Sequence, residues 1–171
     1  MKDLAITRTA ACAAALAVLA PAAALAQQEV ILVRHAELQA GAMAAPKNVP
    51  LSPAGKERAQ RLAALLKDSG VAAIYVTDFT RTNETARPLS QELDRPLTVV
   101  SKGDQQDLAD RLRKNHGGQV VLVVGHTDTL PGLIKSLGYA DSVKIESQDY
   151  GNVFVITPRA GAAPAFLRLR Y

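Results

Sequence analysis

Two apolar runs in this chain end abruptly in a histidine, and the first of these histidines follows an arginine. Arg34 and His35 come directly after the run 29–33, and His126 follows the run 120–125. Open parallel sheets bind their ligands beyond the carboxyl ends of the strands, so two such endings can bring both imidazoles and the guanidinium into one crevice. An imidazole beside fixed cationic donors is suited to phosphoryl transfer.

Strand-like and helix-like segments alternate up to residue 137. Strands are expected at 29–33, 71–77, 96–100 and 120–124, and helices after Ser52, Thr80 and Asp104 and over 130–137. Two later strands, 152–157 and 165–169, are expected to form a hairpin across Pro158 to Pro164. This order predicts a single-domain α/β fold, a three-layer α/β/α sandwich whose doubly wound, mostly parallel sheet has an antiparallel edge formed late in the chain.

Polar residues at the start of three segments are predicted to cap helices. Ser52 is followed by Pro53, a residue favoured at the first helical position, and Thr80 and Asp104 also carry side-chain oxygens that can accept from backbone amides. Pro88 lies within the second helical segment, and because proline lacks an amide hydrogen we expect it to kink or shorten that helix.

The first 26 residues have the features of a secretory signal peptide. Two basic residues precede an alanine- and leucine-rich run that closes with Ala24-Leu25-Ala26, a small-residue cleavage site. A membrane anchor is the alternative, but the run is mostly alanine and contains Pro21. The expected organisation is a signal peptide over 1–26 and one domain over 27–171, exported to the periplasm or the exterior, with no membrane span after cleavage.

Composition excludes several kinds of site. Cys12, the single cysteine, lies in the predicted signal peptide, so the mature chain offers no thiol for a disulfide, for catalysis or for a metal. Aromatic residues make up 4% of the chain and tryptophan is absent, so the stacking platforms of single-strand nucleic-acid binders are missing and no nucleic-acid partner is predicted. The net charge of +4 fits both a solvated basic surface and the attraction of an anionic substrate.

Two further motifs accompany the histidine-bearing strand ends. Residues 51–59 read LSPAGKERA, and residues 74–86 read IYVTDFTRTNETA. Together with LVRHA at 32–36 and VGH at 124–126, they resemble the histidine phosphatase superfamily, also called phosphoglycerate-mutase-like, in order and spacing over nearly all of the mature chain. The resemblance implies phosphoryl transfer through a phosphohistidine.

The resemblance assigns four catalytic residues. Arg34 and His35 stand for the arginine and the nucleophilic histidine of the R-H-G signature, with Ala36 in place of glycine. Arg81 matches the arginine of an R-x-x-E-T-A segment, and His126 matches the second histidine. The chemistry agrees, because a neutral imidazole can attack phosphorus while guanidinium forks neutralise the phosphoryl oxygens, and a protonated second histidine adds a donor.

Other residues near these motifs have secondary interpretations. Thr127 and the amides that begin the helix near Leu130 are expected to add dipole attraction for an anion. Tyr139 and Tyr150 are expected to serve packing more than substrate access. His116, before a Gly-Gly turn, is expected to be a solvated loop residue.

No carboxylate is assigned as the general acid that protonates the leaving group. Asp104 and Asp107 lie where many family members supply a glutamate from an inserted segment, and Asp104 has an equally good role as a helix cap. Asp128 follows the second histidine by two positions, whereas acid-phosphatase members place an aspartate directly after it. Glu37 is close in sequence to the first histidine but is expected to face the wall of the site.

Two alternatives compete with catalysis by this set. The first is a non-catalytic phosphate-binding or sensory protein, which the intact His35 argues against and the unassigned acid argues for. The second is a metal site made by His35, Glu37 and His126, which is disfavoured because two arginines aimed at one place repel a cation. No metal or other cofactor is therefore predicted.

Arg81 also has an interpretation without chemistry. It can pair with Glu84 on its own helix, as oppositely charged residues three positions apart often do.

The favoured function is a secreted or periplasmic phosphatase that hydrolyses a phosphomonoester or a related phosphoryl group without a metal. A mutase is disfavoured, because the longer insertions that hold a phosphorylated sugar acid in family members are missing. A small site without a large cap is expected to admit small or bulky phosphorylated molecules, including lipid-linked phosphates.

Overall fold

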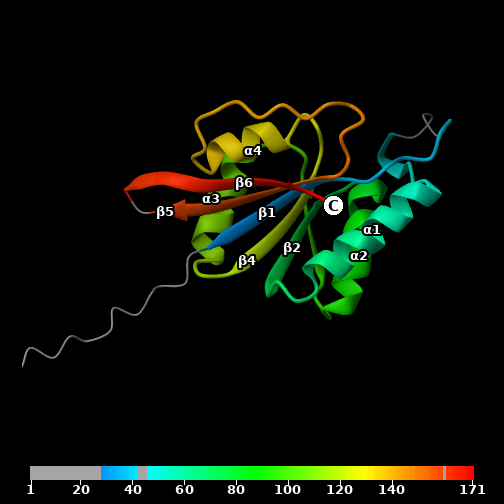
Figure 1. Ribbon diagram of the computed structural model, residues 1–171, viewed down its shortest axis with the longest axis horizontal. Helices are drawn as coiled ribbons and strands as arrows, with labels where there is room; N and C mark the ends of the chain where they lie inside the picture. The colour runs from blue at the N-terminus through cyan, green and yellow to red at the C-terminus, as the bar shows by residue number, and fades with distance from the viewer. Residues whose placement is uncertain (1–27, 42–45, 160) are drawn as a thin grey trace, which may run out of the picture.

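A six-stranded sheet lies at the centre of the structure, with two helices on each face (Figure 1). The structure is a computed structural model that describes residues 28–41, 46–159 and 161–171. The predicted three-layer α/β/α sandwich is confirmed. The predicted signal peptide over 1–26 lies outside the described residues.

The elements follow the expected alternation. The strands are β1 (Glu29–Arg34), β2 (Val71–Thr77), β3 (Leu97–Val100), β4 (Val120–Gly125), β5 (Asn152–Arg159) and β6 (Ala162–Arg170). The helices are α1 (Pro53–Leu66), α2 (Thr80–Glu92), α3 (Gln105–Asn115) and α4 (Leu130–Ser136), with a short 3-10 helix over Pro46–Asn48. The strand order is β3-β2-β4-β1-β5-β6. β1 to β4 run parallel and β5 and β6 form the antiparallel edge, as expected.

The late hairpin is longer than predicted. Pro158 and Pro164, which were expected in the turn, lie within β5 and β6. Gly161, just before β6, has φ 68°, a left-handed conformation that glycine adopts without strain. Pro164 is tolerated because β6 is an edge strand, and the register shifts between Thr157 and Arg159, where Pro158 cannot donate to the ladder.

Alternate residues of the central strands pack against the two helix layers. Val30 and Leu32 of β1 contact the core that α3 and α4 cover, whereas Ile31 and Val33 contact the core that α1 and α2 cover. β4 lies between β1 and β2 and is buried along nearly its whole length, which explains its uninterrupted apolar sequence. The ends of β1 and β4 are therefore neighbours in a rigid part of the fold.

Two of the three predicted caps are confirmed. Ser52 Oγ accepts from the Gly55 amide at 3.1 Å before α1, and the Asp104 side chain caps α3. Thr80 is not a cap, because it is the first residue of α2 and Phe79 occupies the cap position without a side-chain bond. The hydroxyl of Thr82 instead donates to the Phe79 carbonyl at 2.9 Å, from inside the helix.

Two further expectations about helices need correction. α2 runs past Pro88 to Glu92, so the proline does not shorten it. His116 is not a free loop residue, because its Nε2 lies 2.8 Å from the Tyr75 hydroxyl and its Nδ1 lies 2.7 Å from Gln119 Oε1. Within the described ranges, no helix is both long and apolar enough to cross a membrane.

Gly55 allows α1 to approach the main chain that follows the first histidine. A Cβ at this position would lie 2.3 Å from the Glu37 carbonyl oxygen, which is too close for any real contact. The amide of Ser52 also donates to that oxygen at 2.9 Å. The start of α1 therefore fixes the backbone on which His35 stands.

Candidate active site

The carboxyl ends of β1 and β4 bring the four predicted catalytic residues together. Arg34 and Gly125 are register partners, and the rings of His35 and His126 lie 5.3 Å apart between centroids. Arg81, in the first turn of α2, places Nη2 3.4 Å from His126 Nδ1. The side chains of His35 and His126 are 5% and 3% exposed, so both imidazoles are largely shielded from water.

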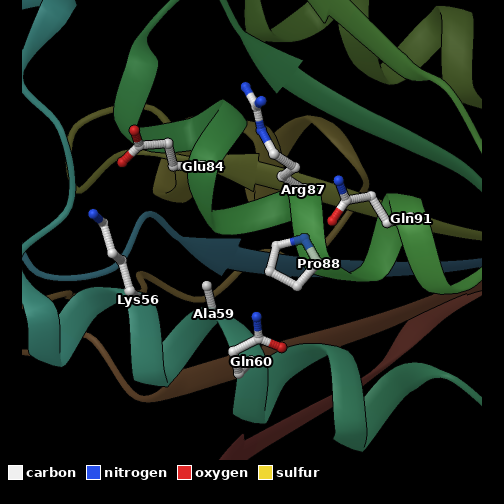
Figure 2. Close-up of a pocket in the computed structure, with 7 residues that line it drawn as sticks. All are labelled: Lys56, Ala59, Gln60, Glu84, Arg87, Pro88 and Gln91. Carbon is white, nitrogen blue, oxygen red and sulfur yellow. The ribbon is translucent and has the colours of Figure 1, made fainter.

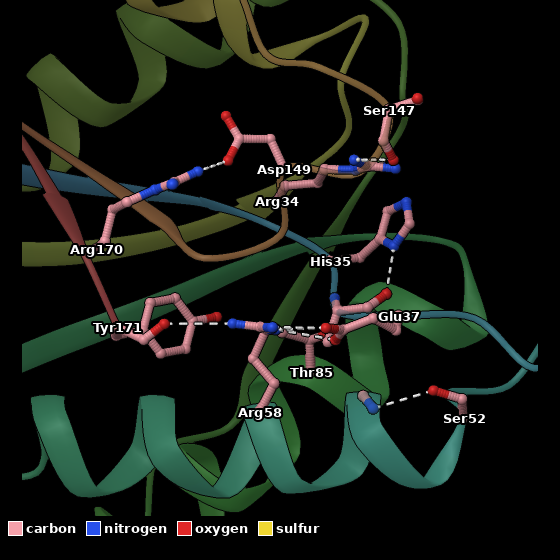
Figure 3. Close-up of polar contacts among 12 residues, drawn as sticks. Arg34, His35, Glu37, Ser52, Arg58, Thr85, Ser147, Asp149, Arg170 and Tyr171 are labelled. Atoms are coloured by element: carbon pink, nitrogen blue, oxygen red, sulfur yellow. Dashed lines mark hydrogen bonds and ion pairs between the residues drawn. The ribbon is translucent and has the colours of Figure 1, made fainter.

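His35 is held with one ring nitrogen available for attack. Its Nδ1 lies 2.9 Å from the Ala36 carbonyl oxygen, which only accepts, so Nδ1 carries the hydrogen and Nε2 keeps its lone pair (Figure 3). Burial lowers the pKa of His35 to about 4, and the charges of Arg34 and Arg81 act in the same direction against the bond to Ala36. The imidazole is therefore neutral at neutral pH, with the lone pair that a nucleophile needs on Nε2.

Ala36 replaces the glycine of the family signature without strain. It is fully buried and its φ is not positive, so the backbone there does not require glycine. Its amide donates to Thr85 Oγ1 at 3.0 Å, and that hydroxyl donates to the Arg81 carbonyl at 2.7 Å. The loop after β1 is thus tied directly to α2.

Main-chain carbonyls and the Tyr150 ring hold Arg34, and Figure 3 shows its bond to Ser147. Its Nη1 donates to the carbonyl oxygens of Glu146 and Ser147 at 3.1 and 2.8 Å, and its Cζ lies 4.1 Å from the centre of the Tyr150 ring. These acceptors are neutral, so they orient the guanidinium without cancelling its charge. Burial lowers the pKa of Arg34, yet an arginine remains charged at neutral pH.

Arg81 and Glu84 have different partners. The Arg81 guanidinium lies 4.2 Å from the centre of the Phe79 ring and reaches the second histidine. Glu84 Oε2 accepts from the Leu51 amide at 2.7 Å. The structure therefore directs the arginine toward His126 and uses the glutamate to hold the segment before α1.

A chain of hydroxyls sets the tautomer of His126. Its Nε2 lies 2.8 Å from Thr77 Oγ1, which lies 3.0 Å from Thr82 Oγ1. Thr82 donates its only hydrogen to backbone carbonyls, so Thr77 donates to Thr82 and accepts from Nε2. Nδ1 of the neutral ring then has no hydrogen and faces Arg81.

His126 is neutral in the absence of an anion. Burial, together with electrostatic contributions from His35, Arg81 and Lys102, lowers its pKa to about 3, against an opposing contribution from Asp128. The extra donor expected from a protonated second histidine therefore requires the charge of a bound phosphoryl group, which favours a hydrogen on Nδ1.

The amides at the start of α4 do not point at an anion. The amides of Thr129 and Leu130 donate to the His126 carbonyl at 3.2 and 3.0 Å, and Thr129 Oγ1 accepts from the His126 amide at 3.1 Å. The prediction of dipole attraction from the amide of Leu130 is wrong. These bonds instead fix the main chain of the second histidine.

Two aromatic residues flank the imidazoles: Phe79, which sequence reasoning did not single out, and Tyr150, for which it favoured packing over substrate access. The Phe79 ring lies 4.9 Å from the His126 ring, and the Tyr150 ring lies 6.2 Å from the His35 ring. The position of Phe79, just before the helix that carries the arginine, is a signal that could have found it. Tyr150 gives no such signal, because it lies in the irregular segment before β5.

Tyr139 behaves as predicted. Its ring stacks on Phe166 at 4.0 Å, and both pack against the core under α3 and α4.

Three of the four candidate acids are engaged elsewhere. Asp104 caps α3, and Asp107 lies on the exposed face of that helix, 3.9 Å from an arginine one turn along. Both oxygens of Glu37 accept from the Arg58 guanidinium at 2.6 to 2.9 Å (Figure 3). Asp128 remains, and its Oδ2 lies 2.6 Å from Lys102 Nζ.

The contacts of Glu37 also bear on the metal alternative. A carboxylate held by Arg58 on both oxygens is not available to complete a site with His35 and His126. In the part of the chain that the structure describes, no cluster of three histidine, cysteine or acidic residues could hold a metal.

Two of the surface cavities lined by α2 differ in how close they come to the candidate site. The first, about 340 Å³, lies between α1 and α2 and contains none of the four predicted catalytic residues (Figure 2). It is lined by Lys56, Ala59, Gln60, Glu84, Arg87, Pro88 and Gln91. The second, about 320 Å³, is lined in part by Phe79, whose ring also contacts His126 and Arg81.

The two buried histidines predict a pH-dependent stability. Their pKa values are about 4 and about 3 in the folded chain against an ordinary 6.5, so between these limits the unfolded chain binds protons that the folded chain excludes. The free energy of unfolding is expected to be highest above pH 6.5 and to fall as the pH drops toward 4. Each group contributes a slope of up to roughly 1.4 kcal/mol per pH unit.

Urea denaturation at a series of pH values checks this expectation. Asparagine at His126 should remove one part of the slope, and asparagine at both positions should remove both parts. A slope that is unchanged in the double variant contradicts the assignment.

Comparison with a family model gives a match to part of the chain. A family model described as the histidine phosphatase superfamily, branch 1, matches residues 30–102. That range contains Arg34, His35 and Arg81 and ends before His126. No curated protein matches the chain.

Solved structures share the fold over most of the chain. The protein histidine phosphatase SixA complexed with tungstate has a TM-score of 0.71 and 20% identity, over 83% of this chain and 96% of that one. Phosphoserine phosphatase of Entamoeba histolytica in complex with 3-phosphoglyceric acid has a TM-score of 0.66 and 16% identity, over 84% of this chain and 97% of that one. A mycobacterial glucosyl-3-phosphoglycerate phosphatase has a TM-score of 0.61 and 13% identity, over 84% of this chain and 97% of that one.

Proposed function

We propose that the chain is a phosphatase of the histidine phosphatase superfamily, which transfers a phosphoryl group to His35 and then hydrolyses the phosphohistidine; the family model over residues 30–102 and the shared fold support this. The observation that supports this most directly is the hydrogen bond from Nδ1 to the Ala36 carbonyl, which leaves Nε2 with its lone pair beside His126 and Arg81. A covalent phosphoenzyme intermediate divides hydrolysis into two steps, each easier than direct attack by water.

The surrounding groups are suited to the charge that such a reaction carries. Arg34 and Arg81 offer fixed positive donors to the equatorial phosphoryl oxygens, and His126 gains a hydrogen on Nδ1 when the anion binds. In the first step Nε2 attacks phosphorus while the bond to the leaving group breaks. In the second step water attacks phosphorus, the P–N bond breaks and its electron pair returns to His35.

The carboxylates limit the range of leaving groups. Of the four candidate acids, three are engaged away from the histidines and the fourth is paired with Lys102. We therefore propose that good substrates have leaving groups that depart without strong acid assistance, such as aryl phosphomonoesters or nitrogen-linked phosphoryl groups. The likeness to a protein histidine phosphatase supports the second of these.

Rapid quench tests the proposal. Enzyme mixed with ³²P-labelled phosphoramidate or p-nitrophenyl phosphate should yield an acid-labile, base-stable adduct on His35. Turnover should continue in EDTA, because Arg34, Arg81 and His126 supply the positive charge that a metal ion would otherwise supply. A panel of phosphorylated metabolites, peptides and lipid-linked phosphates then ranks substrates. Activity that disappears with EDTA and returns with zinc or magnesium overturns the proposal.

A non-catalytic phosphate-binding protein is the second candidate, and the engagement of the four carboxylates is the observation that favours it. Such a protein should bind vanadate or phosphate in calorimetry and give neither adduct nor turnover with any member of the panel. Turnover with even one substrate eliminates it.

We further propose that the protein works outside the cytoplasm after cleavage behind Ala26. The support is the alanine-rich run and the A-L-A sequence at its end. The intact mass of the exported protein is expected to equal the mass calculated for residues 27–171. A species that retains Met1 and sediments with membranes would show an anchor instead.

A further inference from the structure

Asp128 differs from the other candidate carboxylates in its surroundings. Its partner, Lys102, has Nζ 5.9 Å from the centre of the Phe79 ring, and that ring lies 4.9 Å from the ring of His126. Asp128 itself lies in the turn that follows His126, whose main chain Thr129 fixes. The carboxylate is therefore connected to His126 both along the chain, in the turn after β4, and through the contacts of Lys102 with Phe79.

The side chain of Asp128 is open to water. It is 65% exposed, whereas His35 is 5% exposed at the base of the same site. In-line displacement of a phosphoryl group from Nε2 brings the incoming water to the face opposite the buried imidazole, which is the face the leaving group has vacated. Among the four candidate carboxylates, Asp128 is the one that combines exposure to water with an electrostatic effect on both histidines.

The ionisation of Asp128 suits a proton acceptor. Partial burial acts to raise its pKa, but the hydrogen bond and charge of Lys102, with a contribution from His126, lower it overall. An ionised carboxylate can accept a proton at neutral pH but has none to donate. Its negative charge in turn acts to raise the pKa values of His35 and His126, so both imidazoles lie within its field.

We propose that Asp128 is the general base that activates water for the dephosphorylation of His35. This inference rests on the proposed function, because it requires the phosphohistidine. The water oxygen bonds to phosphorus as the P–Nε2 bond breaks, the electron pair returns to His35, and the water proton passes to the carboxylate. Phosphate leaves, and Asp128 releases the proton to solvent.

Pre-steady-state kinetics of Asp128→Asn with p-nitrophenyl phosphate tests this role. General base catalysis typically contributes roughly 10²- to 10⁴-fold, so the second step should slow by at least about 10²-fold while the first step is unchanged. The variant should release close to one equivalent of p-nitrophenol in a burst and then turn over slowly. Quenched samples should contain accumulated phosphoenzyme.

Asp78→Asn is a matched control. Asp78 also pairs with a lysine, Lys47, which lies 5.7 Å from the centre of the Phe79 ring, but Asp78 follows β2 and is not among the charged groups that act on His35. This variant should keep both steps at the rates of the unchanged protein.

Three outcomes overturn the inference in different ways. Wild-type turnover by Asp128→Asn removes the residue from the reaction and leaves the proposed function intact. A slowed burst, with rates that fall steeply as the leaving group becomes more basic, makes Asp128 an acid in the first step instead. Absence of phosphoenzyme from the unchanged protein, together with full activity of His35→Ala, refutes the proposed function itself.

Discussion

His35→Asn is expected to lower kcat by at least roughly 10³-fold and to abolish the acid-labile adduct. Asparagine keeps a neutral side chain with a hydrogen to donate to the Ala36 carbonyl, so the loop should keep its conformation. It lacks the Nε2 lone pair that forms the bond to phosphorus. Stopped-flow or steady-state turnover measures the loss. Vanadate binding should persist, because Arg34, Arg81 and His126 are unchanged.

His116→Asn is the control for this experiment. His116 bonds to Tyr75 and Gln119, apart from the clustered site residues, so its replacement should leave kcat and labelling nearly unchanged. If His35→Asn retained full turnover and labelling, the nucleophile would be another residue and the proposed mechanism would fail.

Arg81→Ala is expected to lower kcat/KM by roughly 10²-fold or more and to weaken inhibition by vanadate. The guanidinium lies against His126 and over Phe79, where it meets the charge that develops on the phosphoryl oxygens. Loss of the contact with Phe79 should cost only about 0.5–1 kcal/mol of stability, so the melting temperature changes little. Lysine at this position should rescue partly, because it restores the charge without the planar fork.

Arg87→Ala supplies the matched comparison. Arg87 lies on the same helix and is exposed between the two surface cavities, so its loss should leave kcat/KM within about twofold, as usual for a surface substitution. Near-normal kcat/KM and unchanged vanadate affinity in Arg81→Ala would remove Arg81 from the site.

Hydrophobic periodicity predicted the layers of the fold and the placement of the two histidines. Apolar runs such as 120–124 identify buried strands directly, and the rule that ligands bind beyond strand ends then brings His35 and His126 together. Local capping was predicted equally well where a side chain alone decides it, as at Ser52 and Asp104. The prediction failed at Thr80, because α2 begins one residue earlier than a Thr80 cap requires and Phe79, which has no polar side chain, occupies the cap position.

The rest of the site depends on contacts between distant segments. Nothing in the local sequence shows that carbonyls near residue 147 hold Arg34, or that Tyr150 covers that guanidinium. The environment of Asp128 likewise depends on Lys102, from the end of another strand, so its ionisation could not be predicted from its position after His126. Pairing of this kind follows from tertiary packing and not from propensity.

The strand order also has a consequence for how the chain acquires its active site. β4 lies between β2 and β1, so it is the only strand joining the unit β3-β2 to the unit β1-β5-β6 within the described sheet. During synthesis β1, β2 and β3 all emerge before it, which leaves two apolar strand edges without their shared neighbour. Long-range pairing of this kind is slow, because loop-closure entropy is lost before contacts compensate for it. His126 should thus reach His35 only when β4 pairs with β1 and β2, so the active site should form late in folding.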